Sequence, residues 1–351
     1  MSRFFEVLAP PRNPFYVDDA EVDLSGKTAY INKSSVTAWK PTDDTNLTGR
    51  YCMAEFEDKL HIITQTEHVT FDGEEIVTES MLPEGYVSGG GRLVVWKGEL
   101  HLLGGGWTNL TPADKASALS HYVYNSTSGW RKYITKDNKE VKLPYQFYNG
   151  SAVVFKNEIC IFGGGASSNR KKFYHFDGSS WKQYKKSTLP EAIWGNNLIK
   201  LCTTTFRNET AISYLRFMYY KKDKKGIYTT YSKRGRLISA NEWSWDDDYI
   251  GSYDGIPTGF VVDDLGDDEF RFISTVNPLT INQKFDIYYV NGDYSYTIIK
   301  SFSNLPLNVV NNGYAIMYKG ILYLFKAIVD DTGHILRTSI QELYTLDIVE
   351  E

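Results

Sequence analysis

The sequence predicts an all-β fold in which one antiparallel module recurs along the chain. Two stretches are almost the same: "VVWKGELHLLGGG" begins at Val94, and "VVFKNEICIFGGG" begins at Val153. Each consists of an apolar strand, a two-residue turn and a second strand, because Gly and Asn tolerate the positive φ angles of a tight hairpin. Aromatic residues make up 15% of the chain, and their side chains favour pleated, half-buried surfaces.

The same hairpin pattern is found at further places when the glycines are not required. The last residues before the turns are Phe56, Trp96, Phe155, Phe206, Leu265 and Tyr318. They follow one another at intervals of roughly 50 residues, a spacing typical of propeller blades. The repeat therefore predicts a β-propeller of six blades, each with four antiparallel strands, and five or seven blades stay open as alternatives.

The second half of each module is marked by tryptophan. In "FYHFDGSSWKQY", Trp181 follows Phe176 across a turn, and in "YVYNSTSGWRKY", Trp130 follows Tyr124 in the same way. Each segment predicts a third strand, a turn and a fourth strand that opens on tryptophan. A Leu-Pro pair then begins the connection to the next module, where the missing N–H of proline removes no ladder hydrogen bond.

The two ends of the sequence complement each other. The last module, from residue 313 onward, has only three strand-like segments, whereas Trp39-Lys40 in the segment 28–50 resembles the start of a fourth strand. We therefore expect the N-terminal segment to complete the last blade, which removes an open sheet edge. The expected single propeller domain spans residues 28–351, with blades near 51–89, 90–149, 150–195, 196–258, 259–312, and 313–351 plus 28–50.

Residues 1–27 precede this domain as a proline-rich arm. Proline is disfavoured inside a sheet, and this segment contains Pro10, Pro11 and Pro14. Its apolar side chains would be exposed to water if the arm extended freely, so we expect it to dock on the propeller or on a neighbouring subunit. The expected docking residues are Phe4, Phe5 and Leu8.

Glycines, aromatic residues and tryptophans at this spacing resemble the kelch repeat. The resemblance rests on Gly104–Gly106 with Tyr124 and Trp130, and on Gly163–Gly165 with Phe176 and Trp181; two of the six modules carry it fully. It implies a kelch-like propeller in which the glycines permit close backbone approach where second strands converge near the axis. The expected structural repeat residues are Gly104, Gly105, Gly163, Gly164, Trp130, Trp181 and Trp39.

Composition and motifs exclude several classes of function. The net charge of -5 leaves no basic excess for nucleic acid, and no segment approaches the ~20 apolar residues of a membrane span. The N-terminus lacks the apolar run of a signal peptide, so we expect a soluble protein made in the cytoplasm. No metal, cofactor or catalytic motif is recognisable. His61 and His101 occupy equivalent strand positions; we interpret them as buried strand residues, and a ring of metal ligands is the alternative.

Candidate binding residues gather in the segments that lie on one predicted face of the propeller. Tyr and Trp with Arg are typical of interaction hot spots and of sugar-stacking sites; the alternative is that these aromatic residues fill the gaps between blades. The predicted binding residues are Trp107, Arg170, Trp194, Tyr86, Tyr145 and Tyr253.

These features favour a non-catalytic binding or assembly module, and not an enzyme. The content of Lys, Asn, Tyr and Ile is typical of a low-GC genome, and small lone propellers resemble structural proteins of bacteriophage particles, such as tail, fibre or capsid-associated components. The expected partners are other protein subunits of a larger assembly, with a glycan as a further candidate ligand. Two alternatives stay open: a carbohydrate-binding adhesin propeller and a kelch-type enzyme that acts on sugars.

Overall fold

The computed structural model describes most of the chain from residue 27 to residue 350. The described residues are 27–33, 52–63, 67–86, 90–106, 111–184, 188–189, 192, 198–204, 212–222, 224, 228–239, 242–253, 257–266, 269–276, 284–290, 296–303, 315–319, 321–329 and 335–350. Side chains are described chiefly between residues 52 and 184. The expected arm, 1–27, therefore lies outside the described residues except for Lys27, which begins the first strand.

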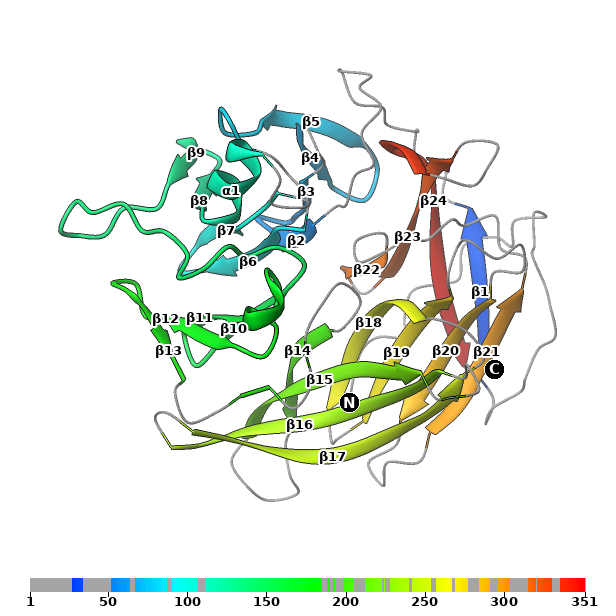
Figure 1. Ribbon diagram of the computed structural model, residues 1–351. Helices are drawn as coiled ribbons and strands as arrows, with labels where there is room; N and C mark the ends of the chain where they lie inside the picture. The colour runs from blue at the N-terminus through cyan, green and yellow to red at the C-terminus, as the bar shows by residue number, and fades with distance from the viewer. Residues whose placement is uncertain are drawn as a thin grey trace.

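The described residues form six four-stranded antiparallel sheets, so the all-β prediction is confirmed (Figure 1). The first sheet contains β2 (Cys52–Phe56), β3 (Lys59–Ile63), β4 (Glu67–Phe71) and β5 (Ile76–Met81). The second sheet contains β6 (Arg92–Trp96), β7 (Glu99–Leu103), β8 (His121–Asn125) and β9 (Gly129–Lys132). The third sheet contains β10 (Ser151–Phe155), β11 (Glu158–Phe162), β12 (Phe173–Phe176) and β13 (Trp181–Gln183).

The other three sheets follow the same strand order. The fourth sheet contains β14 (Leu198–Thr204), β15 (Ile212–Lys222), β16 (Tyr228–Ser239) and β17 (Glu242–Tyr253). The fifth sheet contains β18 (Pro257–Gly266), β19 (Glu269–Val276), β20 (Lys284–Val290) and β21 (Tyr296–Ser303). The sixth sheet contains β22 (Ala315–Tyr318), β23 (Ile321–Val329), β24 (Ile335–Glu350) and β1 (Lys27–Lys33).

The hairpins at the start of the first three sheets have the expected two-residue turns. Both central residues have positive φ angles in each: 48° and 58° at Glu57-Asp58, 49° and 75° at Lys97-Gly98, and 49° and 61° at Lys156-Asn157. Positive φ at both positions defines the type I′ turn, whose twist matches that of the flanking strands. The turn expected after Phe206 lies outside the described residues, and Leu265, expected to end a strand, is followed in β18 by Gly266.

The N-terminal strand joins the C-terminal sheet. β1 pairs antiparallel with β24, in a register that runs from Lys27 opposite Glu350 to Lys33 opposite Tyr344. The sixth sheet therefore receives its fourth strand from the other end of the sequence, as expected. Trp39, which suggested this pairing, lies outside the described residues.

Successive sheets lie around a common centre in a propeller-like arrangement (Figure 1). The first strands of neighbouring sheets lie side by side, in the order β2, β6, β10, β14, β18 and β22. Trp96 Nε1, at the end of β6, donates to Asn157 O in the turn of the third sheet at 2.9 Å. Tyr318 Oη, at the end of β22, donates to Asp58 O in the turn of the first sheet at 2.5 Å. The same contact thus joins the second sheet to the third and the sixth sheet to the first.

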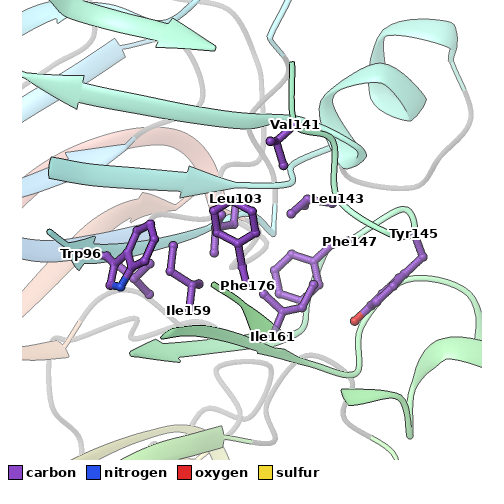
Figure 2. Packing of buried hydrophobic residues seen from close by; sticks show 10 residues of the cluster. Trp96, Leu103, Val141, Leu143, Tyr145, Phe147, Ile159, Ile161 and Phe176 are labelled. Carbon is purple, nitrogen blue, oxygen red and sulfur yellow. The ribbon is translucent and has the colours of Figure 1, made fainter. Parts of the chain in front are cut away.

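The cores of the described sheets are shared between neighbours. Figure 2 shows the cluster between the second and third sheets, where side chains from β6, β7, β11, β12 and the intervening connection interleave. Among them Phe176, Ile159 and Ile161 are fully buried. One module cannot cover its own apolar face, so stacking of neighbours supplies the core.

In the described residues, two short helical segments lie in second-to-third-strand connections. They are α1 (Pro112–Ala118), between β7 and β8, and the 3-10 turn η1 (Ser167–Asn169), between β11 and β12. Within the described ranges, no helix is long and apolar enough to cross a membrane.

Candidate functional site

The segments that join one sheet to the next, and second strands to third strands, form what we call the connector face. Its described parts are residues 82–86, 90–91, 104–106, 111–120, 133–150 and 163–172. Tyr86 Oη donates to Gly104 O at 2.8 Å, and Tyr145 Oη donates to Gly163 O at 2.6 Å. Each tyrosine comes from the connection that leads into a sheet and binds the first glycine at the end of the second strand of that sheet. Two successive connections are therefore fixed in the same way.

The glycine runs are required by close contacts with the 143–150 connection. Gly104 has a φ of +65°, and a Cβ atom there would lie 2.1 Å from Phe147 O. Gly165 has a φ of +65° as well, and its Cβ would lie 2.2 Å from Gln146 O. The Gly105 N–H donates to Phe147 O at 3.1 Å. The expectation of close backbone approach is met, but the neighbour is the connection between sheets, whereas we expected second strands converging on the axis.

Helix α1 supports the same connection. Thr111 and Asp114 form a capping box: the Asp114 N–H donates to Thr111 Oγ1 at 3.1 Å, and the Thr111 N–H donates to Asp114 Oδ2 at 3.1 Å. The Phe147 N–H donates to Ala118 O at 2.7 Å, at the end of the helix. This helix was not expected from the sequence, although Thr111-Pro112 followed by Asp114 is a typical helix start.

Arg92 is a cation at the start of β6 that the sequence analysis also missed. Its side chain is half-buried, and Nη1 donates to Gly91 O at 2.8 Å. Burial lowers the pKa of Arg92, and Cys52 at the start of β2 lies nearby. Burial raises the pKa of the Cys52 thiol to about 12, so Cys52 is an uncharged neighbour at neutral pH. In the described part of the chain no ion pair involves Arg92.

The predicted binding residues have different places in the structure. Tyr145 is buried and Tyr86 half-buried, and their hydroxyls make the contacts with glycine carbonyls given above. Arg170 is half-buried and follows η1. Tyr253 is the last residue of β17. The residues Trp107, Trp194, Phe4, Phe5 and Leu8 lie outside the described residues, and the binding roles of the whole set stay predictions.

Histidines form buried pairs inside the first two sheets. His61 Nε2 lies 3.1 Å from Phe56 O, and His61 Nδ1 lies 2.8 Å from His68 Nε2. In the second sheet His101 repeats both contacts, at 3.2 Å to Trp96 O and 2.9 Å to His121 Nε2. A carbonyl only accepts, so His61 and His101 carry their proton on Nε2, and the second histidine of each pair donates from its own Nε2.

These histidines are held neutral by their surroundings. Burial lowers the pKa of His68 to about 3 and that of His101 to about 4. The interpretation of His61 and His101 as buried strand residues is confirmed, since each is about 2% exposed or less. Within the described residues no group of three or more His, Cys, Asp or Glu side chains is placed to hold a metal ion.

Tryptophans from the next sheet approach the second histidine of each pair. Trp130 Nε1 donates to His68 Nδ1 at 3.2 Å, across the junction of the first and second sheets. At the next junction Trp181 lies near His121, with ring centroids 6.0 Å apart. Trp181 Nε1 and His121 Nδ1 are both buried, and neither has a hydrogen-bond partner among the described residues.

Comparisons with known proteins give a likeness of structure but none of sequence. No model of a protein family and no curated protein matches the sequence. Among solved structures, the chain is similar to a novel α-L-arabinofuranosidase, CtGH43, from Clostridium thermocellum. The TM-score is 0.39 and the sequence identity 9%, over 72% of this chain and 95% of the other.

This likeness corrects the expected function. We expected a non-catalytic structural protein of a phage particle and no enzymatic activity, whereas the protein with the similar structure is an enzyme. The non-catalytic interpretation is therefore wrong on this comparison. At this identity and TM-score, no activity and no residue role is transferred from the arabinofuranosidase to this chain.

Proposed function

We propose that this protein is a carbohydrate-active β-propeller in which each of the six sheets is one blade of a kelch-like ring. In this proposal the connector face binds a glycan, and the protein acts on that glycan as an enzyme. The proposal follows the sugar-directed alternatives that the sequence left open.

The fixed connections between sheets carry this proposal. Tyr86 and Tyr145 attach two successive connections to glycine runs with the same hydrogen bond. Loops held on a rigid β scaffold are where binding and catalytic residues concentrate. The same face carries half-buried Gln146 and Arg170, whose side chains are of the kinds that hydrogen-bond sugar hydroxyls.

Cleavage of a glycosidic bond requires a pair of carboxyl groups, one as acid and one as base or nucleophile. Among the connections of the two kinds that form the connector face, two have adjacent acidic residues in the sequence: Asp43-Asp44 between β1 and β2, and Asp330-Asp331 between β23 and β24. Both pairs lie outside the described residues. These carboxyl groups are the first candidates to test. The connection with Asp43-Asp44 joins two sheets, and the connection with Asp330-Asp331 joins a second strand to a third strand. These are the two kinds of connection that form the connector face.

The test is an activity screen with the full chain. Neutral and acidic polysaccharides are incubated with wild-type protein and with Asp43→Asn/Asp44→Asn and Asp330→Asn/Asp331→Asn double variants, and reducing ends are measured. We expect wild-type protein to release reducing ends and at least one double variant to be slower by about 100-fold or more.

Asp72→Asn is the matched control, since Asp72 is exposed and lies in the turn between β4 and β5. It should retain full activity. Absence of both glycan binding and reducing-end release across the panel would rule out the proposed function.

A further inference from the structure

We infer that the glycan bound by the connector face is anionic, and that its carboxylate or sulfate group binds the guanidinium of Arg92. This inference rests on the proposed function and names the class of its ligand.

The guanidinium of Arg92 is only partly used by the protein. Nη1 donates to Gly91 O at 2.8 Å and lies 3.5 Å from Gly90 O. A guanidinium has five N–H donors in a fixed planar fork. Within the described part of the chain, no acceptor is hydrogen-bonded to Nη2 or Nε, so the edge that pairs best with a carboxylate is not taken by a neighbouring side chain.

Among the residues that the structure describes, no acidic side chain forms an ion pair with Arg92. The described ion pairs of the chain lie elsewhere, at Glu79, Glu99, Glu140, Glu158 and Asp177. A charged side chain withdrawn from water is costly unless an opposite charge accompanies it. An anionic ligand would supply that charge.

The backbone before Arg92 is held in place by the next connection and by a tyrosine of its own connection. The Asn149 N–H donates to Gly90 O at 2.8 Å, and a Cβ atom on Gly91 would lie 2.9 Å from Tyr86 Oη. Arg92 therefore begins β6 from a turn that is packed on both sides. A guanidinium on a fixed stem loses little further freedom when it binds an anion.

The local charge of the neighbouring connection agrees with an anionic ligand. The segment 163–172, "GGGASSNRKK", has three basic residues and no acidic one, although the whole chain has a net charge of -5. Local basic groups raise the concentration of an anion near the face and speed its association. The ligand class thus follows from a partly buried arginine and from the basic segment, which are independent observations.

The test measures binding of matched oligosaccharides to the full chain by calorimetry. The probes are an oligogalacturonate, its methyl ester as the neutral form of the same backbone, and a sulfated oligosaccharide. We expect the acidic probes to bind at least tenfold more tightly than the methyl ester, and the stronger of the two identifies carboxylate or sulfate as the natural group.

Variants of Arg92 assign the effect to this side chain. Arg92→Gln should lose the preference for acidic probes, whereas Arg92→Lys, which keeps the charge and loses the planar fork, should retain part of it. Arg131→Gln is the matched control, because Arg131 is exposed on β9 and pairs with Glu99; it should leave the preference unchanged. If Arg92→Gln does not fold, the reduced affinity of folded Arg92→Lys for the acidic probe still decides.

Equal affinity for the acidic and methyl-esterified probes, or an unchanged preference in both Arg92 variants, would overturn the inference and leave the proposed function standing. Failure of every oligosaccharide in the panel to bind would overturn both together.

Discussion

The junction between the first and second sheets and the junction between the second and third sheets are built from the same residue types with different results. In the first, Trp130 Nε1 donates to His68 Nδ1 at 3.2 Å, and the ring centroids lie 5.3 Å apart. In the second, the Trp181 and His121 rings lie 6.0 Å apart, and their two nitrogens are buried without a partner among the described residues. The repeat places a donor and an acceptor at each junction, but only one junction brings them within bonding distance.

Aromatic packing replaces the hydrogen bond at the second junction. Tyr133 stacks on His121 with centroids 4.8 Å apart and an interplanar angle of 12°, and Phe176 lies edge-on to His121 at 5.3 Å. Phe176 also stacks on Trp181 at 5.1 Å. A repeated module can therefore hold its neighbour by polar or by apolar contacts, provided that the core is filled.

The largest expected effect on stability comes from removing the aromatic ring of Phe176 at the junction between the second and third sheets. Phe176 is fully buried and contacts His121, Tyr133 and Trp181. Phe176→Ala should lower the free energy of unfolding by about 3–5 kcal/mol, because the lost contacts and the cavity add. Chemical denaturation measures it, with Val95→Ala, an exposed strand position, as the control. If Phe176→Ala lowered the free energy of unfolding no more than the control, aromatic packing would not be what holds this junction together.

Acid should destabilise both junctions in the same direction. An unfolded histidine titrates near pH 6.5, whereas burial lowers the pKa of His68 to about 3. Between these values the unfolded state binds more protons, so the free energy of unfolding falls as the pH decreases below about 6.5. By pH 5 one such histidine costs about 2 kcal/mol.

His68→Gln should therefore lose less stability between pH 6.5 and pH 5 than the wild-type protein, by about 2 kcal/mol. His121→Gln should behave alike, because burial also lowers the pKa of His121. Denaturation curves at the two pH values make the comparison. Unchanged pH dependence in both variants would show that these histidines are not the groups that titrate.

A smaller difference in stability is expected between variants of the two tryptophans. Trp130→Phe removes the donor to His68 and should cost about 1 kcal/mol more than Trp181→Phe, whose N–H has no described partner. The two substitutions remove the same atoms, so each serves as the control for the other. Equal losses of unfolding free energy would show that the hydrogen bond does not distinguish the junctions.

The smallest effect on stability is expected for the tyrosine–glycine hydrogen bonds, which the two connections have in common. Tyr86→Phe and Tyr145→Phe each delete one hydroxyl that donates to a glycine carbonyl, so each should cost about 1 kcal/mol. Thermal denaturation with both variants tests this similarity. A large difference between them would mean that the connections are held differently despite their common geometry.

Local features of the fold were predictable from the sequence. The turns at Glu57-Asp58, Lys97-Gly98 and Lys156-Asn157 depend on positive φ, which a short stretch of sequence indicates. The pairing of β1 with β24 was predictable from counting strands, because the last module lacked one. The loss of bonding distance between Trp181 and His121 was not, since it depends on how two whole sheets pack.

The candidate site was less predictable than the fold. Tyr86, Tyr145 and Arg170 were named as binding residues, but the hydroxyls of the two tyrosines bind glycine carbonyls. Arg92 gave no signal, because an arginine that begins a strand is ordinarily solvated. The turn that precedes it packs against Asn149 of the next connection, and this contact between segments far apart in the sequence is contained in no local pattern.

The pairing of β1 with β24 sets the order in which the molecule can be completed. On the ribosome, β1 is synthesised before the other described strands and must wait, without its partner, until residues 335–350 have emerged. Contacts between such distant segments form slowly, because a long loop must close first. Until then β24, a long strand of 16 residues, would present an unpaired edge to other chains. The pairing of β1 with β24 is thus also the step that covers this exposed edge and prevents the newly synthesised chain from associating with other chains.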